Sequence, residues 1–469
     1  MKDLWRFIKS SGIYFAGTVL TKLISFLLLP LYTAYINPSD YGVYDLYNAY
    51  ITFLCSVLFL DIWAGIMRFM YDYTGEDKKK PISCGLVIFT FSSTLYTIIL
   101  IVAVQFLHVN YPALLFGYGI LMNLQILVGY IARGYGRNVL YTVAGLIGSI
   151  VTIVFNIVLL VYAHMDYSAL FIASCIGYIV NIMIVVIGIR VPKAFSIRSF
   201  DKKLFKEMLL FSLPLCLNSV AYWFLTSYNR VAVSAVLGTE ANGYYAIAGR
   251  FGSMITLFTT CFQMAWQELA FSKSAKEDDL GEFYSTAINS YIKSMGAGLI
   301  ILIPMIFVIY PIMVNDAYDS GKDLVPLYLM GTILSTVSSF LGNTFSAIKK
   351  NSLLFMTMAA GSIVNVASVH LLLPVLGLQA SNIALMSGFM VICISRVILL
   401  KREMTLKIGY SSILILIASF IGVSVFYIRG GMLANVVAFI LAIAVTVYLF
   451  KDIIVIMFRK LKNGGIQQG

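Results

Sequence analysis

Four basic residues lie inside stretches of this sequence that are otherwise long and apolar. They are Lys22, Arg230, Arg250 and Lys293. An ionisable side chain at the centre of a membrane-spanning helix costs about 2.5–3.5 kcal/mol, so such residues usually face a bundle interior or a water-filled cavity. Arginine can hold a phosphate group through two parallel hydrogen bonds. The excess of cations therefore favours an anionic substrate, and these four residues are the candidate phosphate ligands.

Simpler explanations compete with ligand binding for some of these residues. Lys293 lies about two turns inside its predicted helix and could extend its side chain to the membrane surface. Arg250 could pair with a partner on a neighbouring helix, which is the usual fate of a buried charge. Lys22 lies near the middle of the first apolar stretch, too deep to reach water easily. A functional role is therefore favoured for Lys22.

One acidic residue and several amides accompany these cations. Asp61, in the second apolar stretch, could be the partner of Lys22 or a proton-coupling group, and the sequence does not separate these roles. The amides could hydrogen-bond the hydroxyl groups of sugars, although bonds between helices are their commoner use. These amides are Asn48, Asn218, Asn229, Gln263 and Gln267.

Motifs for catalysis, metal binding or nucleotide hydrolysis are absent from the sequence. The six cysteines are scattered singly, and the three histidines share no ligand spacing. No phosphate-binding loop, nucleophile elbow or zinc-protease motif occurs. The sequence therefore predicts a protein that is not an enzyme and has no cofactor, with coupling to H⁺ or Na⁺ left open.

The composition indicates that the candidate residues lie in membrane-spanning helices. Hydrophobic residues make up 60% of the 469 residues and charged residues only 12%, which excludes an ordinary soluble domain. Since one span needs about 20 apolar residues, the chain offers about fourteen spans. The predicted fold is an all-α polytopic membrane protein with helices over 11–36, 42–69, 82–107, 112–132, 139–163, 167–190, 207–236, 243–270, 286–312, 324–348, 352–373, 378–400, 409–428 and 431–457.

Basic residues occur almost only in alternate loops between these spans. One set of loops includes the lysines at 78–80 and the basic run from Arg396 to Lys407, whereas the other set holds only Lys322 and Arg429. Loops rich in Lys and Arg stay in the cytoplasm, so both termini are predicted to be cytoplasmic. The net charge of +12 is thereby explained without nucleic acid, and the lipid bilayer is the predicted surrounding.

The second half of the chain repeats part of the first half in the same direction. Gly42 and Tyr44 match Gly243 and Tyr245, with an offset of 201 residues in both cases (243 − 42 and 245 − 44). Such repeats are typical of carriers whose binding site lies between two lobes. The predicted organisation is an N-terminal lobe of six helices (1–190), a cytoplasmic linker (191–206), a C-terminal lobe of six helices (207–400), and two further helices with a cytoplasmic tail (401–469).

Four short motifs resemble those of a known superfamily. They are Leu-Leu-Leu-Pro-Leu-Tyr-Thr at 27–33, Asp-Tyr-Gly-Val-Tyr-Asp at 40–45, Ser-Leu-Pro-Leu at 212–215 and Asn-Arg at 229–230. On these residues the chain resembles the multidrug/oligosaccharidyl-lipid/polysaccharide flippase superfamily, and within it the Wzx-type polysaccharide flippases. Members often carry Asp-Arg at the last motif, so Asn229 is a departure from the family pattern.

The resemblance implies two MATE-like lobes, alternating access, and a central cavity lined by the first, second, seventh and eighth predicted helices. Lys22, Arg230 and Arg250 lie on these helices, whereas Lys293 does not. The implied cargo is an undecaprenyl-diphosphate-linked oligosaccharide that crosses from the cytoplasmic to the outer leaflet of the bacterial cytoplasmic membrane, for capsule, O-antigen or exopolysaccharide synthesis. A polysaccharide polymerase and glycosyltransferases are the implied partners.

On this interpretation, Lys22 and Arg230 bind the diphosphate, Arg250 assists, and the amides hold the sugars. Three alternatives stay open. A lipid II flippase would share the lobes and the cationic cavity, whereas a MATE-type drug or cation antiporter should favour carboxylates in that cavity. An integral-membrane glycosyltransferase would need catalytic carboxylates in a sizeable outer loop, and the longest such loop, 315–323, is short.

Overall fold

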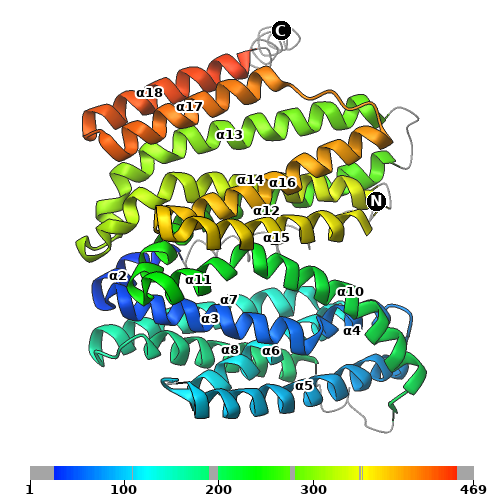
Figure 1. The fold of residues 1–469 in the computed structure, drawn as a ribbon. Coiled ribbons are helices and arrows are strands. Elements are labelled where there is room, and N and C mark those ends of the chain that lie inside the picture. The colour runs from blue at the N-terminus through cyan, green and yellow to red at the C-terminus, as the bar shows by residue number, and fades with distance from the viewer. Residues whose placement is uncertain are drawn as a thin grey trace, which may run out of the picture.

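The computed structural model describes residues 26–107, 109–189, 199–274, 280–347, 350 and 352–451. Within these ranges every regular element is a helix, as predicted, and most helices run side by side (Figure 1). The first half of the chain comprises α2 (Leu29–Tyr35), α3 (Pro38–Phe59), α4 (Ile62–Met70), η1 (Gly75–Lys78), α5 (Lys79–Phe106), α6 (Pro112–Gly134), α7 (Asn138–Ile157), η2 (Val158–Tyr162) and α8 (Ser168–Ile189). The second half comprises α10 (Lys202–Thr226), α11 (Tyr228–Leu237), α12 (Thr239–Ser274), α13 (Leu280–Met313), η4 (Asp316–Leu324), α14 (Val325–Ala347), α15 (Ser352–Leu376), α16 (Gln379–Glu403), α17 (Tyr410–Arg429) and α18 (Met432–Leu449).

The chain is a multi-pass membrane protein. Within the described ranges, 11 helices are long and apolar enough to cross a membrane, or up to 12 when the bent pair α3–α4 counts as one span. The predicted number of about fourteen spans is not confirmed. Most of the first predicted span, 11–36, lies outside the described residues, and α12 is not among the eleven. The polar residues Arg250, Gln263 and Gln267 lower the average apolarity of α12.

The start of α3 explains how the first repeat motif folds. The side chain of Asn37 accepts a hydrogen bond from the backbone N–H of Asp40 at 2.9 Å, so Asn37 caps the helix. Pro38 follows at the first helical position, where its missing N–H costs nothing. The helix therefore begins at Pro38 and not at Gly42 as predicted, because the turn-forming residues make up its first turn.

The second predicted helix, 42–69, is wrong as a single helix. Leu60 and Asp61 adopt left-handed conformations, with φ angles of 55° and 50°, and α4 bends away from α3 by 47°. A break inside a membrane is tolerated where neighbouring protein satisfies the freed backbone groups. The hydroxyl of Ser92 supplies one such contact, because it donates to the carbonyl oxygen of Leu58 at 2.6 Å.

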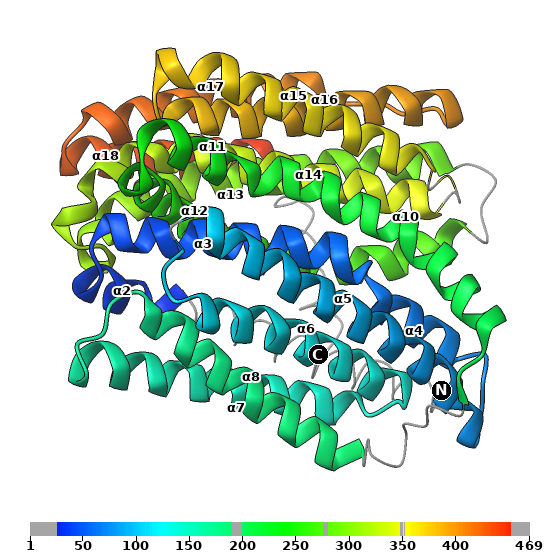
Figure 2. The same ribbon diagram turned by 60° about the horizontal axis from the view of Figure 1, so that its bottom comes forward.

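The helices of the two chain halves form two groups: α3–α8 lie in the lower half of Figure 1 and α12–α16 in the upper half, with α10 and α11 of the second group next to α3 between them. We call them the N-terminal lobe (α3–α8) and the C-terminal lobe (α10–α16), and α17 and α18 pack against α13 of the latter. The predicted helix 207–236 corresponds to α10 and α11, which form one candidate span from Lys202 to Leu237 with a local break at Ser227. α10 packs against α3, α4 and α5 on one side and against α15 on the other, as Figure 2 shows. α10 therefore joins the two lobes.

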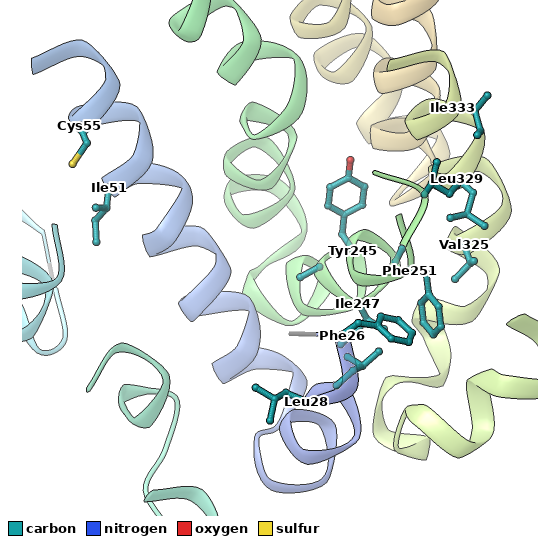
Figure 3. Close-up of a cluster of buried hydrophobic side chains, with 14 of the residues drawn as sticks. Phe26, Leu28, Ile51, Cys55, Tyr245, Ile247, Phe251, Val325, Leu329 and Ile333 are labelled. Atoms are coloured by element: carbon teal, nitrogen blue, oxygen red, sulfur yellow. The ribbon is translucent and has the colours of Figure 1, made fainter. Parts of the chain in front are cut away.

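The end of the first predicted helix packs into the C-terminal lobe. Figure 3 shows the buried side chain of Phe26 beside Ile247 and Phe251 of α12. The ring centroids of Phe26 and Phe251 are 5.8 Å apart, and Phe251 stacks on Tyr310 of α13 at 5.5 Å. Since lipid tails are as apolar as these side chains, close packing contributes more to this contact than removal of water.

Candidate functional site

The first turns of α3 and α12 touch each other, and we call this contact the α3–α12 seam. A Cβ atom on Gly42 would lie 1.7 Å from the carbonyl oxygen of Thr239, and one on Gly243 would lie 2.0 Å from that of Pro38. Only glycine allows the two backbones to approach so closely. The repeat in the sequence matched Gly42 with Gly243, but it did not indicate that the two copies would be in contact.

Hydrogen bonds hold the seam together. The hydroxyl groups of Ser39 and Thr239 are 2.9 Å apart. The side-chain amide of Asn242, which is fully buried, donates to the carbonyl oxygen of Gly42 at 2.9 Å. The two lobes are therefore joined by close packing and by polar contacts at this end of the molecule.

An ion pair joins the lobes one turn further along α3. Nε of Arg230, on α11, donates to Oδ2 of Asp45, on α3, at 2.6 Å. The two side chains are only 17% and 15% exposed. Nη1 of the same arginine donates to the carbonyl oxygen of Thr226 at 2.7 Å, and the guanidinium carbon lies 5.9 Å from the ring centroid of Tyr245. Arg230 is therefore fixed in place by contacts with both lobes.

Arg250 makes a second contact between the lobes. Its Nε donates to the hydroxyl oxygen of Tyr41 at 2.6 Å, and the guanidinium carbon lies 5.9 and 5.8 Å from the ring centroids of Tyr32 and Tyr41. Aromatic faces attract a cation electrostatically. Within the described part of the chain, no carboxylate lies within ion-pair distance of Arg250. Tyr41 and Asp45 are four residues apart, so they share one face of α3.

A cavity of about 360 Å³ lies between α3 and the C-terminal lobe. Most of its lining is small or carries a hydroxyl group, and of the described lining residues only Asp45 and Arg230 are charged. The lining comprises Asp45, Asn48, Ala49, Thr52, Tyr222, Thr226, Ser227, Arg230, Gly249, Gly252, Ser253, Thr256, Tyr328, Gly331, Thr332, Ser335, Leu385 and Phe389. Because the two charges pair with each other, the described wall offers hydroxyl groups and one neutralised arginine.

Asp61 lies at the break between α3 and α4 and not in this cavity. Its Oδ2 accepts a hydrogen bond from the hydroxyl of Ser219 on α10 at 2.6 Å. Elsewhere along the same helices, Nε1 of Trp223 donates to the carbonyl oxygen of Ala49 at 2.9 Å. Asp61 therefore belongs to the line of contacts along which α10 runs antiparallel to α3.

The other predicted ligands lie in different places. Asn48 lines the cavity, and its side-chain oxygen accepts from the hydroxyl of Tyr118 at 2.9 Å. Asn229 is fully buried inside the C-terminal lobe, where its amide donates to the carbonyl oxygen of Ser381 at 2.9 Å and exchanges hydrogen bonds with Asn365. Asn229 therefore does not face the cavity.

Other candidates lie away from the cavity or outside the description. Asn218 on α10 and Lys293 on α13 are partly exposed and are not among the lining residues. Gln263 and Gln267 belong to α12, but the placement of their side chains lies outside what the structure describes. Lys22 lies outside the described residues. The cavity thus brings together Arg230 and Asn48 of the predicted set.

Sequence reasoning missed the polar face of α14. Tyr328, Thr332 and Ser335 line the cavity, and their spacing of four and three residues places them on one face of the helix. This spacing inside an apolar stretch was a usable signal. Sequence reasoning also counted Arg396 with the basic residues of a loop, although it lies within the predicted helix 378–400. The side chain lies within α16, is 3% exposed, and donates to the carbonyl oxygen of Ser338 at 2.5 Å.

Comparison with known proteins adds independent evidence. A family model described as "Polysaccharide biosynthesis protein" matches residues 7–267. The fold is similar to that of the structure titled "Lipid II flippase MurJ, inward closed conformation", with a TM-score of 0.69, 14% identity, and coverage of 94% of this chain and 99% of that one. It is also similar to the inward-facing conformation of a multidrug resistance MATE family transporter of the MOP superfamily, with a TM-score of 0.67, 16% identity, and coverage of 82% and 94%. No curated protein sequence matches the chain.

Proposed function

Because the chain belongs to the polysaccharide biosynthesis protein family and has the fold of the MOP superfamily flippases, we propose that it carries lipid-linked oligosaccharides across a membrane. The proposed cargo is an undecaprenyl-diphosphate-linked oligosaccharide repeat unit, as in the Wzx-type flippases. The proposed direction is from the cytoplasmic to the outer leaflet of the bacterial cytoplasmic membrane. The proposed mechanism is alternating access, with 1–190 and 207–400 rocking against each other as two lobes.

The observation that carries this proposal is the position of Arg230 in a hydroxyl-lined cavity between the lobes. A guanidinium group suits a phosphate, and hydroxyl groups suit the hydroxyl groups of a sugar. A polar headgroup cannot cross the hydrocarbon layer without such a path. The volume of about 360 Å³ lies near the lower end of the roughly 300–1,000 Å³ that ligand pockets span, so it suits the part of the cargo next to the lipid.

The orientation of the chain follows from its basic loops. The basic loops that the structure describes lie at the opposite ends of the helices from the α3–α12 seam, so the seam is proposed to be at the outer surface. The termini and the linker at 191–206 are proposed to be cytoplasmic. Because the seam is closed at the proposed outer surface, the cargo would enter the cavity from the cytoplasmic leaflet. This agrees with the proposed direction of transport.

The membrane potential favours this direction of transport. An inside-negative potential drives anions outward with about 2.3 kcal/mol per charge for each 100 mV. Two uncompensated phosphate charges would gain about 4–5 kcal/mol. A polysaccharide polymerase and glycosyltransferases are the expected neighbours, because they consume and supply such a cargo.

The cavity argues against a cation antiporter. Of the described lining residues, Asp45 is the only acid, and its charge is neutralised by Arg230. A carrier for cationic drugs should instead present carboxylates that are free to bind the cation.

Reconstitution tests the proposal. Full-length protein in liposomes, loaded with a fluorescent undecaprenyl-diphosphate oligosaccharide on one leaflet, should expose the glycan on the other leaflet to a membrane-impermeant glycosidase. Parallel liposomes with lipid II and with a cationic dye test the two rival cargoes. Transport of lipid II or of the dye without transport of the oligosaccharide would contradict the proposal.

A further inference from the structure

The ion pair between Asp45 and Arg230 lies in the wall of the cavity that the cargo is proposed to enter. We propose that Asp45 occupies the anion position on Arg230 when the carrier is empty, and that the diphosphate of the cargo displaces it. The exchange releases α3 from α11 and thereby couples cargo binding to opening of the α3–α12 seam. This inference rests on the proposed function and names how its site is regulated.

The geometry of the pair allows such an exchange. Arg230 gives Asp45 a single hydrogen bond, from Nε, and its Nη1 is used by the carbonyl oxygen of Thr226. Oδ2 of Asp45 also accepts a long hydrogen bond, of 3.5 Å, from the amide of Asn242. Within the described residues, no hydrogen bond of Nη2 is seen. A phosphate group can accept from Nε and Nη2 together, which is the stronger arrangement for an arginine. The diphosphate would therefore replace one hydrogen bond by two.

Nη2 of Arg230 and the hydroxyl of Tyr328 both lie next to Gly249 in the wall of the cavity. A Cβ atom on Gly249 would lie 3.5 Å from Nη2 of Arg230 and 3.0 Å from the hydroxyl oxygen of Tyr328. The absence of a side chain at Gly249 keeps this position open to the cavity. A phosphate oxygen in the cavity, in front of Gly249, could accept hydrogen bonds from Nη2 and from the hydroxyl of Tyr328 at once.

The same pair is a structural link between the lobes. Of the ion pairs within the described residues, only Asp45–Arg230 connects the N-terminal lobe to the C-terminal lobe. Asp45 lies one turn from Gly42, which is in the seam. A ligand stabilises the conformation to which it binds more tightly. The diphosphate binds Arg230 more tightly when the Asp45–Arg230 ion pair is broken, so it stabilises the conformation without that pair. Cargo bound to Arg230 therefore favours separation of the seam.

Four variants of the full-length protein in detergent test the exchange. Asp45→Asn removes the competing charge, and Asp40→Asn is the matched control, because Asp40 lies on the same turn-rich start of α3 but bonds Asn37. Gly249→Ala places a methyl group against Nη2 of Arg230 and the hydroxyl of Tyr328, and it changes neither member of the ion pair. Ser39→Cys combined with Thr239→Cys reports on the seam, because oxidation can join the two residues only while it is closed.

The probes are farnesyl diphosphate and inorganic pyrophosphate, with affinity measured by calorimetry and disulfide yield by peptide mass spectrometry. Asp45→Asn should bind both probes about tenfold more tightly than the wild type, and Asp40→Asn should bind them as the wild type does. Gly249→Ala should bind them about tenfold more weakly. Farnesyl diphosphate should lower the disulfide yield severalfold, and Asp45→Asn should lower it without ligand.

Two sets of results would overturn the inference in distinguishable ways. The exchange would be refuted if Asp45→Asn, Gly249→Ala and the wild type bound the probes with equal affinity. It would also be refuted if farnesyl diphosphate did not change the disulfide yield. Either result would leave the proposed function standing. If Asp45→Asn does not fold, a wild-type affinity of Gly249→Ala for the probes is enough to refute the exchange. Absence of diphosphate binding in every protein, wild type included, would refute the proposed function and the exchange together.

Discussion

Gly42 and Gly243, which are 201 residues apart, face each other across the α3–α12 seam, and each lies against a carbonyl group of the other helix. The two copies of the repeat thus form one contact between themselves. Because backbone carbonyls cannot move aside as flexible side chains can, this contact is the most restrictive in the described interface between the lobes.

Alanine at either glycine should force the first turns of α3 and α12 apart. Overpacking typically costs about 1–3 kcal/mol, so Gly42→Ala and Gly243→Ala should each lower the thermal midpoint of the purified protein. Gly145→Ala is the matched control, since a Cβ on this α7 residue would meet nothing within 4 Å. If Gly145→Ala lowered the thermal midpoint as much as the two seam variants do, the effect would not be specific to the seam.

The break between α3 and α4 makes a second prediction, on backbone strain. Leu60 has a φ of 55°, a conformation that costs non-glycine residues roughly 1–2 kcal/mol and β-branched residues more. Leu60→Val should therefore lower the thermal midpoint, whereas Leu60→Gly should leave it close to the wild type because relief of strain offsets lost packing. Equal midpoints for the two variants would contradict the left-handed conformation at this position.

Asn229 tests whether the buried amide network in the C-terminal lobe is structural. Members of the superfamily that the chain resembles often carry aspartate at this position. In this chain, Asn229→Asp would remove the amide N–H that donates to the carbonyl oxygen of Ser381. Leaving a buried polar group unsatisfied costs about 1–3 kcal/mol, so Asn229→Asp should lower the midpoint of thermal unfolding. A midpoint at or above the wild-type value would show that the network tolerates a carboxylate.

Arg396 is predicted to stabilise the packing of α14, α15 and α16. Its guanidinium group donates to the carbonyl oxygen of Ser338 on α14 and, at 3.1 Å, to the hydroxyl of Thr357 on α15. Arg396→Ala leaves a gap and unpaired groups, and should destabilise the fold by about 2–4 kcal/mol in denaturant titration. Arg402→Ala, on the exposed end of the same helix, should have no measurable effect, and an equal loss there would argue against a specific role for Arg396.

Much of the fold was predictable because the bilayer restricts what an apolar stretch can become. Runs of about 20 apolar residues predicted the helices. Asn37 and Pro38 were read as a turn before a helix at Gly42, although they are also a recognisable cap and first residue of α3. The break at Leu60 and Asp61 was not predictable, because neither glycine nor proline occurs there and the conformation depends on packing against α10. Arg396 was counted with the loop cations because basic residues follow it at 401, 402 and 407, although it lies within the predicted helix and α16 continues to Glu403.

The site was less predictable than the fold. The position of Arg230 inside an apolar stretch of the sequence predicted a functional residue, and in the structure its side chain lines the cavity. Its partner Asp45 lies 185 residues away, and their contact depends on how two lobes meet, which no local pattern encodes. Asn229, only one residue from Arg230, points into the core instead, because successive residues of a helix face different directions.

The proposed transport depends above all on Arg230, which is proposed to bind the diphosphate of a cargo that crosses between the lobes. The most direct test is the initial rate at which purified protein in liposomes exposes an undecaprenyl-diphosphate oligosaccharide on the opposite leaflet, compared for the wild type, Arg230→Ala and the control Arg429→Ala at equal protein density. If Arg230 binds the diphosphate, the rate for Arg230→Ala should fall to that of protein-free liposomes, while Arg429→Ala should transport as the wild type does. Wild-type transport by Arg230→Ala would contradict this role.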